Sequence, residues 1–165
     1  MIAGLKAEAL PNVTVVEKAV SDMVGEAVLH VDIRPDLGAA ASSLMELSGM
    51  EAQTQAVTVP TTTVDAFSEA LGAYPDLVKI DVERFEPNVI GGAHRVIERR
   101  RPIIIFELWE SHWGRYQPMT DYLRRFYHMV RLSDGADAQK YYSANTGEGV
   151  DDILCIPLSP HYARS

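Results

Sequence analysis

Two short apolar runs that each end in carboxylates constrain the fold of this chain more than any other feature. Residues 77–80 are followed by Asp81 and Glu83, and residues 103–106 are followed by Glu107. In open α/β sheets, ligands bind beyond the carboxyl ends of the strands. If the two runs are neighbouring parallel strands, Asp81, Glu83 and Glu107 face one crevice, and we expect the chemistry of the protein there.

The stretch between the two runs predicts a helix. Pro87 opens it, because proline is favoured in the first turn of a helix. Its apolar positions recur at helical spacing and are Val89, Ile90, Ala93, Val96 and Ile97. A strand–helix–strand unit of this kind has parallel strands joined by a right-handed crossover. Because both runs are apolar on both faces, we expect helices on each side and therefore a three-layer α/β sandwich.

The rest of the chain predicts further short strands. Residues 12–21 and 26–33 are rich in β-branched side chains and flank a turn at Gly25, which indicates a hairpin-like pair. Three more strands are expected at residues 56–59, 129–132 and 153–156. Residues 34–49 have no clean period and predict a long loop, of the kind that often forms a lid or a substrate wall.

Capping residues predict two more helices. Thr62 or Thr63 caps a helix that ends at Gly72, and Thr120 caps a later one. Residues 133–135 have the Ser-Asp-Gly composition of a turn between strands.

Composition limits the partners of the protein. The 165 residues fit one domain, spanning residues 1–165, and 47% of them are hydrophobic, which is enough for a core. The formal net charge of -8 repels phosphate backbones and anionic lipids, so neither nucleic acid nor a membrane surface is expected as a partner. No run approaches the ~18 apolar residues of a membrane span, and Lys6 and Glu8 interrupt any signal peptide. We therefore expect a cytoplasmic protein.

Some familiar motifs are absent. Of eleven glycines, only Gly147 and Gly149 form a G-x-G, which lacks a third glycine and precedes a strand rather than a helix. Gly91 and Gly92 lie inside a helical pattern and indicate close packing of the helix against the sheet. The single cysteine, Cys155, excludes an internal disulfide and a Cys-based zinc cluster, and its apolar neighbours predict a core position.

Each candidate acid has a structural alternative. Asp81 follows a strand directly, which suits a catalytic carboxylate but also a cap for the following turn. Glu83 and Glu107 can accept backbone N–H groups, or can bind substrate hydroxyls or a metal. Lys79 is two positions before Asp81 on the same strand face, from which its ammonium group can reach a nearby carboxylate.

The segment from Glu107 to His112 allows two further interpretations. Together with Asp81 it can be drawn as a divalent-metal site, but spacing alone supports this weakly and we assign no metal ligand. Three aromatic residues lie nearby: Trp109, Trp113 and Tyr116. They can stack on a ring or a sugar, although packing over the core is the commoner role of such side chains.

The order of these segments is similar to that of the FkbM family of S-adenosylmethionine-dependent methyltransferases. The matching segments are Asn12-Val with Ala19-Val-Ser-Asp22 and Gly25, Ser42-Ser-Leu44, Thr62-Thr-Val-Asp65, Val78-Lys-Ile-Asp-Val-Glu83 with Glu86, Gly91-Gly-Ala93, Arg101-Pro-Ile-Ile-Ile-Phe-Glu107 and Asp152-Ile-Leu-Cys-Ile-Pro157. Each segment alone is weakly specific. Seven segments in one order make the resemblance specific over nearly the whole chain.

The resemblance implies a Rossmann-like methyltransferase fold with S-adenosylmethionine as cofactor. By this resemblance Ala19, Val20, Ser21 and Asp22 flank the adenine of the cofactor, and Asp81 lies near the methyl donor. The methyl acceptor in such families is often a hydroxyl of a sugar or a natural product. A carboxylate beside the acceptor can take the hydroxyl proton, and the tryptophans of the crevice can accommodate the acceptor.

This chain departs from the family pattern in two places. The family has a glycine-rich cofactor loop after its first strand, and that loop belongs upstream of Met1, so we interpret the chain as the C-terminal portion of the fold, incomplete at the N-terminus. We expect such a portion to be inactive and weakly stable by itself. Arg84 stands where the family usually has glycine. Either Arg84 pairs with a neighbouring carboxylate, or the turn is reshaped.

Two other functions stay open from the sequence. A non-catalytic remnant can act as an interaction module that pairs with another chain through an exposed sheet edge. A metal-dependent hydrolase can use Asp81, Glu83, Glu107 and His112.

Overall fold

The computed structural model describes residues 11–33, 42–45, 54–138, 140, 142 and 149–158 of the chain. The strands are β1 (Ala19–Val20), β2 (Gly25–Asp32), β3 (Thr54–Thr62), β4 (Leu77–Ile80), β5 (Ile103–Trp109), β6 (Tyr127–Arg131) and β7 (Val150–Pro157). The helices are α2 (Val64–Leu71), α3 (Glu86–Gly91), α4 (His94–Arg100) and α5 (Trp113–Leu123), with a 3-10 turn, η3 (Glu110–His112).

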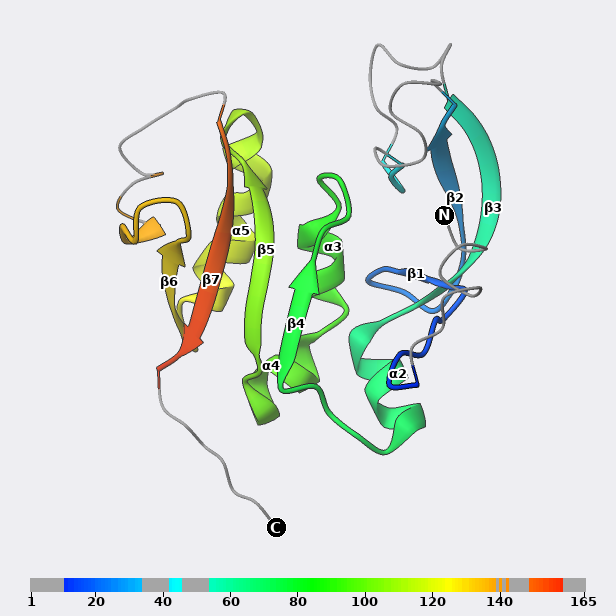
Figure 1. Ribbon diagram of the computed structural model, residues 1–165, viewed down its shortest axis with the longest axis horizontal. Helices are drawn as coiled ribbons and strands as arrows, with labels where there is room; N and C mark the ends of the chain where they lie inside the picture. Colours follow the sequence, from blue (N-terminus) through cyan, green and yellow to red (C-terminus); the bar gives the residue numbers. More distant parts are fainter. Residues whose placement is uncertain are drawn as a thin grey trace.

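The strands form two separate sheets (Figure 1). One has the order β1-β3-β2 and the other the order β4-β5-β7-β6. β4 and β5 are parallel, as the sequence predicts, and Ile80 pairs with Phe106. β7 lies between β5 and β6 and is antiparallel to both. The protein therefore has the predicted α/β class, with two mixed sheets.

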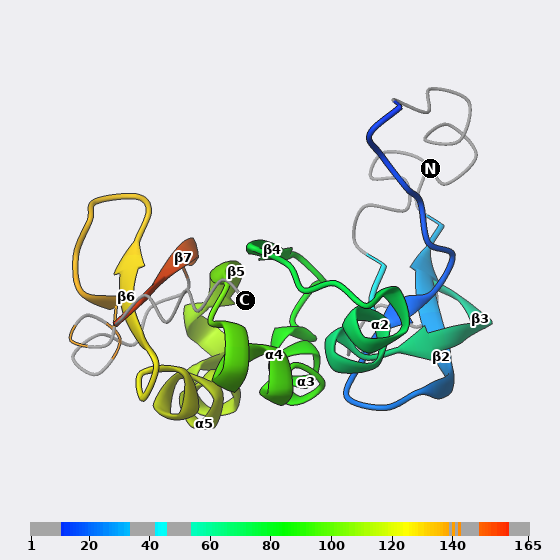
Figure 2. The ribbon, with the colours of Figure 1, turned by 90° about the horizontal axis from the view of Figure 1, so that it is seen from below.

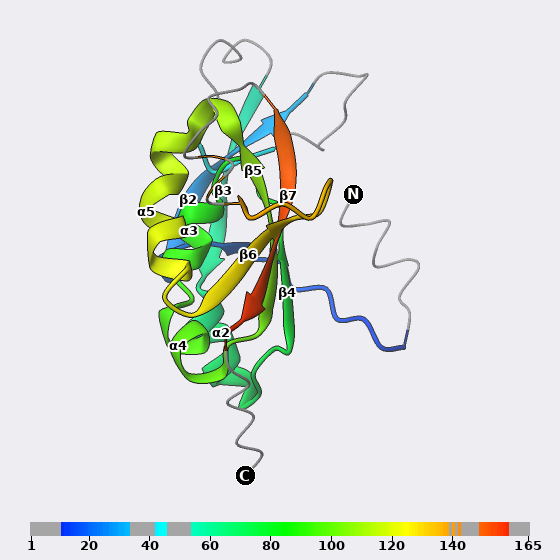
Figure 3. The same ribbon diagram turned by 90° about the vertical axis from the view of Figure 1, so that its left-hand side faces the viewer.

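Helices α3, α4 and α5 cover one face of the four-stranded sheet (Figures 2 and 3). Along β5 the side chains alternate, so that Ile104, Phe106 and Leu108 are buried while Glu107 and Trp109 are only half-buried. The sequence predicts helices on both faces, whereas these three helices lie together on one. None of the helices within the described residues is long and apolar enough to span a membrane.

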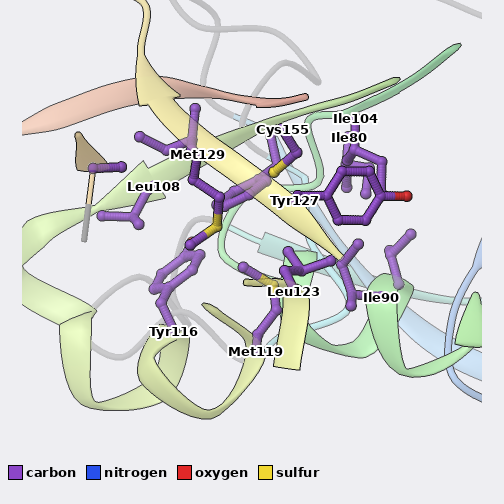
Figure 4. Packing of buried hydrophobic residues seen from close by; sticks show 14 of the residues in the cluster. Ile80, Ile90, Ile104, Leu108, Tyr116, Met119, Leu123, Tyr127, Met129 and Cys155 are labelled. Atoms are coloured by element: carbon purple, nitrogen blue, oxygen red, sulfur yellow. The ribbon is translucent and has the colours of Figure 1, made fainter. Parts of the chain in front are cut away.

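The hydrophobic core lies between the four-stranded sheet and its helices (Figure 4). Its fully buried side chains include Ile104, Phe106 and Leu108 of β5, Tyr116 and Leu123 of α5, and Ile153 and Cys155 of β7. Burying one large apolar side chain contributes about 1.5–3 kcal/mol to folding. Cys155 is a core residue, as predicted, and burial raises the pKa of its thiol.

Side-chain and backbone caps define α2 and the start of α4. Thr63 accepts a hydrogen bond from the Ala66 N–H at 2.9 Å, and Gly72 ends α2 with a left-handed φ of 63°, so both predicted helix boundaries are confirmed. Asp65 of α2 accepts from the N–H groups of Arg95 and Val96, each at 2.9 Å. One side chain thereby satisfies two unpaired donors at the start of another helix.

Two predicted elements differ from the structure. Residues 12–21 and 26–33 do not form a hairpin, because β1 and β2 each pair with β3 instead, β1 parallel and β2 antiparallel. The helix that Pro87 opens is interrupted at residues 92–93, since Asp65 caps a new helix there. The predicted loop at residues 34–49 lies outside the described residues except for residues 42–45.

Thr120 does not cap a helix. It is buried inside α5, which begins at Trp113 and contains Pro118. Its hydroxyl donates to the Gln117 carbonyl at 2.9 Å, so the side chain bonds back toward the preceding turn and not to a free N–H group. The turn at residues 133–135 is confirmed, with Gly135 at a φ of 74°.

Gly92 lies where the helical layer meets the three-stranded sheet. A Cβ atom at this position lies only 2.2 Å from the Ser21 carbonyl oxygen and 3.0 Å from the Thr63 Cβ. The first distance is far inside van der Waals contact, and its partner is backbone that cannot move alone. The prediction of close packing at this glycine pair is therefore confirmed for Gly92.

Gly92→Ala is expected to lower the free energy of unfolding by about 1–3 kcal/mol, the usual cost of overpacking. Gly91→Ala is the matched control, because a Cβ there meets only the Asp22 Cβ, at an ordinary 3.5 Å. The control is expected to be neutral or stabilising by up to about 1 kcal/mol, the helix preference of alanine over glycine. Urea unfolding of both variants gives the comparison, and equal effects contradict the packing argument.

Candidate functional site

The three predicted acids meet at the carboxyl ends of β4 and β5. Asp81 follows β4 directly, and Glu83 lies in the turn that leads to α3. Because Ile80 pairs with Phe106, Glu107 stands one residue further along the neighbouring strand, level with Asp81. The parallel register brings the acids together as the sequence predicts.

Lys79 and Asp152 extend this cluster along the open face of the sheet. The Lys79 Nζ lies 2.7 Å from the Asp152 Oδ1 and 3.7 Å from the Asp81 Oδ2. Asp152 pairs with Glu107 in the register of β7 with β5. Partial burial works to lower the Lys79 pKa, but the hydrogen bond and charge of Asp152 outweigh it and raise that pKa.

Sequence reasoning anticipated that Lys79 reaches a carboxylate but missed Asp152 as its partner. The pair Asp151–Asp152 before the last apolar run is the only local signal for it. That signal identifies a partner only if β7 is known to lie beside β5, which no short-range pattern indicates.

Two carboxyl groups of the cluster are harder to ionise than usual. Burial raises the pKa of Glu83, and the negative charges of Glu107 and Asp81 raise it further. Burial also raises the pKa of Glu107, while a hydrogen bond from Trp109 opposes the shift. Desolvation and like charge both disfavour the ionised form, and such perturbed groups gather at functional sites.

Arg84 occupies a reshaped turn. Glu83 and Arg84 both have left-handed backbone angles, with φ of 51° and 72°. The Arg84 Nη1 lies 3.4 Å from the His112 Nε2, and the guanidinium carbon lies 5.5 Å from the Trp109 ring centroid. Among the described residues, no carboxylate is within ion-pair distance of Arg84, so of the two alternatives the turn is the one that changes.

Only one of the three aromatic residues near the crevice borders the acid cluster. The Trp109 Nε1 donates to the Glu107 Oε2 at 2.7 Å. Trp113 stacks on Tyr142 with ring centroids 5.5 Å apart, and Tyr116 is fully buried. Trp113 and Tyr116 thus serve packing, which leaves Trp109 to present a ring beside the acids.

The segment that the resemblance assigns to adenine follows β1. Ser21 is buried and its N–H donates to the Thr62 carbonyl at 2.8 Å, while Asp22 is exposed. Asn88 of α3 donates to the Asp22 Oδ2 at 3.2 Å. Helix α3, which starts just after the Glu83 turn, therefore lies next to this segment. Ala19 and Val20, the two residues of β1, are half-buried.

The acids and His112 do not converge as metal ligands. Within the described residues, no group of three or more histidine, cysteine, aspartate and glutamate side chains has the arrangement of a metal site. The His112 Nε2 faces Arg84, and its Nδ1 lies 2.9 Å from the Ser111 Oγ. Burial lowers the pKa of His112, and the positive charges of Arg84 and Arg115 lower it further.

Glu83→Gln is expected to stabilise the fold more at pH 7 than at pH 4. A raised pKa means that the folded chain holds the proton more tightly than the unfolded chain, so stability falls as pH rises through the folded-state pKa. The substitution removes this loss. Urea unfolding at both pH values measures it, with Glu26→Gln, an exposed acid of β2, as the control for losing one negative charge. An equal gain at both pH values contradicts the expected coupling.

The comparisons with known proteins agree with this geometry. The sequence model described as the methyltransferase FkbM domain matches residues 5–133, which include the three candidate acids but not the final segment of the resemblance. Comparisons with curated proteins and with solved structures found no match. Since the match covers well over half of the 165 residues, the chain belongs to the FkbM methyltransferase family.

Proposed function

We propose that this protein is an S-adenosylmethionine-dependent methyltransferase that acts on a hydroxyl of a sugar or another natural product. The observation that carries the proposal is the acid cluster at the carboxyl ends of β4 and β5, in a chain of the FkbM family. When bound, the cofactor supplies an electrophilic methyl group on a positively charged sulfur. The acceptor is a small molecule, and the proposal includes neither nucleic acid nor a membrane as partner.

The residues present suit a cationic cofactor. Glu83 and Glu107 carry raised pKa values because burial and like charge disfavour their ionised forms, and a nearby positive charge relieves that repulsion. The exposed carboxylate of Asp22 can accept hydrogen bonds from hydroxyl or amino groups of a nucleoside. Both features support the assignment of residues 19–22 and of the acid cluster to the cofactor.

Asp81 is the residue best placed to take the proton of the acceptor hydroxyl. Its side chain is 57% exposed, so an acceptor can reach it, and Lys79 stands 3.7 Å away. Glu83 and Glu107 border the same space and can orient the acceptor by hydrogen bonds. Methyl transfer depends chiefly on alignment, and a fixed turn with a tryptophan ring beside it supplies rigid walls. Asp81, Glu83 and Glu107 are the proposed catalytic residues.

The proposal has a second part, which concerns the chain alone. A tight cofactor site of this kind needs a glycine-rich turn, and the 165 residues contain no such motif. We propose that the isolated chain binds S-adenosylmethionine weakly and is inactive. A cytoplasmic location belongs to the same proposal.

Ligand-observed NMR with S-adenosylmethionine and S-adenosylhomocysteine tests the proposal. We expect saturable binding with a dissociation constant between about 10 µM and 1 mM. The sulfonium form should bind about two- to fivefold more tightly than the neutral thioether, the size of a partly exposed charge pair. Glu107→Gln should remove that preference, because it removes a negative charge beside the sulfonium.

Glu69→Gln is the control, since Glu69 is an exposed acid of α2 that pairs with Arg95 away from the cluster. Equal affinity for the two nucleosides, or no saturable binding below about 1 mM, contradicts the cofactor assignment. A dissociation constant below about 10 µM contradicts the proposed weakness of the isolated chain.

A second candidate function is supported by a groove along β4. Among the described strands β4 pairs only with β5, so the backbone groups of its other edge face the groove. The groove has a volume of about 760 Å³ and is lined mainly by apolar side chains. Those from its two walls include Val20, Val64, Phe67, Leu71, Leu77 and Val78. A free strand edge beside an apolar groove suits an extended polypeptide, and this favours an interaction module that adds a strand from another chain.

Size-exclusion chromatography with light scattering separates this candidate from the enzyme. If β4 pairs with another copy, the wild-type chain elutes above the mass of a monomer, and Leu77→Lys returns it to a monomer because the charge enters the apolar groove. Leu77 is 55% exposed, so its replacement leaves the core intact. Val28→Lys on β2, at a site 46% exposed, is the control. A monomeric wild-type chain at every concentration contradicts self-pairing.

A further inference from the structure

Glu86 is a fully buried acid that the proposed reaction does not use. It is the first residue of α3 and is 0% exposed. Its Oε1 accepts the Val82 N–H at 3.1 Å, and its Oε2 accepts the Tyr116 hydroxyl at 2.6 Å. Burial raises the pKa of Tyr116, and the hydrogen bond to Glu86 raises it further, so the phenol stays a donor.

The direction of these bonds points away from a helix-capping role. An acid in the first turn ordinarily serves the unpaired N–H groups of its own helix. Glu86 instead reaches back four residues to Val82, inside the turn that carries Glu83. Burying a carboxyl group costs free energy that only good partners offset. Here both of its hydrogen-bond partners tie the turn to the core, one through the backbone and one through α5.

The turn needs such restraint. Glu83 and Arg84 are consecutive side-chain-bearing residues with left-handed φ angles, and each costs about 1–2 kcal/mol relative to the ordinary region. Strained residues of this kind persist only where the surroundings determine them, and they gather at functional sites. Ser43 holds the same turn from the opposite side, since its hydroxyl donates to the Glu83 carbonyl at 2.8 Å.

We propose that Glu86 is a positioning residue, which acts together with Tyr116 to hold the turn between β4 and α3 in its left-handed form. In this form the Glu83 carboxyl group lies close enough to Glu107 and Asp81 to interact with their charges. Without the two bonds of Glu86 the turn relaxes, and the acids separate although they remain in the chain. The relevance to methyl transfer rests on the proposed function, whereas the restraint of the turn does not.

Backbone and carboxyl NMR on the full chain test the restraint. The variants are Glu86→Gln, Glu86→Ala and Tyr116→Phe. Glu86→Gln keeps an acceptor for the Val82 N–H, so it should leave the exchange rate of that amide near the wild-type value. Glu86→Ala should raise the rate about tenfold, the loss of one buried hydrogen bond, with Tyr116→Phe in between. The charge of Glu86 itself raises the pKa of Glu83, and both Glu86 variants remove it. The Glu83 carboxyl should therefore titrate at lower pH in Glu86→Ala than in Glu86→Gln, because only in the alanine variant does it move away from Asp81 and Glu107.

Leu123→Ala is the control, because Leu123 is fully buried on the same helix as Tyr116 and its aliphatic side chain cannot form a hydrogen bond with Glu86 or with the turn. It lowers stability in general, so it shows what a merely structural loss does to the same signals. Equal changes in Leu123→Ala and Tyr116→Phe, in amide exchange and in Glu83 titration, overturn the proposal. Should Glu86→Ala fail to fold, Tyr116→Phe and Glu86→Gln still decide.

Binding of S-adenosylmethionine to the same variants tests whether the restraint of the turn affects the cofactor site. Tyr116→Phe should reduce the preference for the sulfonium over the thioether, and Glu86→Gln should retain it. A turn that loosens while the preference stays unchanged overturns the link between Glu86 and the cofactor. If the wild-type chain does not prefer S-adenosylmethionine over S-adenosylhomocysteine, the result counts against the proposed function. The restraint of the turn by Glu86 is then judged from the NMR result alone.

Discussion

The parallel pairing of β4 with β5 places Asp81 beside Glu107, and the rest of the site is built around these two acids. With Ile80 opposite Phe106, the chain leaves β4 level with Glu107, and Asp81 and Glu83 follow on the same side. Side chains alternate along a strand, so a slip of one residue would turn Glu107 toward the helices and the apolar core. Ile104, Phe106 and Leu108 are buried on the face that the helices cover. Because side chains alternate along β5, this burial keeps Glu107 on the open face.

Close polar contacts join the two sheets where no strand does so among the described residues. Gly92 allows α3 and α4 to approach the Ser21 backbone, and Asp65 of α2 caps α4. Ser43, which bridges to β2 through His30, donates to the turn after β4. These contacts are short and directional, so they specify how the two parts meet but add little buried apolar area. The packing of each sheet with its helices supplies most of the stability.

Local patterns in the sequence were sufficient for the elements whose causes are local. The parallel unit from β4 to β5, the cap at Thr63 and the end at Gly72 all follow from spacing and capping within a few residues. The pairing of β2 with β3, the position of β7 and hence the role of Asp152 depend on contacts between distant segments, which no short pattern contains. The prediction that Thr120 caps a helix was wrong for a different reason. Threonine is a common capping residue, but the Thr120 hydroxyl donates to the Gln117 carbonyl in the preceding turn.

Unfavourable features of the structure gather at one end of β4. Two acids with raised pKa values, two left-handed residues and one fully buried acid lie beside the carboxyl ends of β4 and β5. At the other end of the sheet, Arg101 before β5 also has a left-handed φ, of 49°. A structural turn needs none of these, since glycine at position 84 and an apolar residue at position 86 avoid both the strain and the desolvation. Backbone strain and buried acids lower the stability of a fold, and they are expected at functional sites, where residues are held for binding or catalysis. The stability lost around Asp81, Glu83 and Glu107 therefore supports the carboxyl ends of β4 and β5, and not the apolar groove beside β4, as the proposed place of reaction.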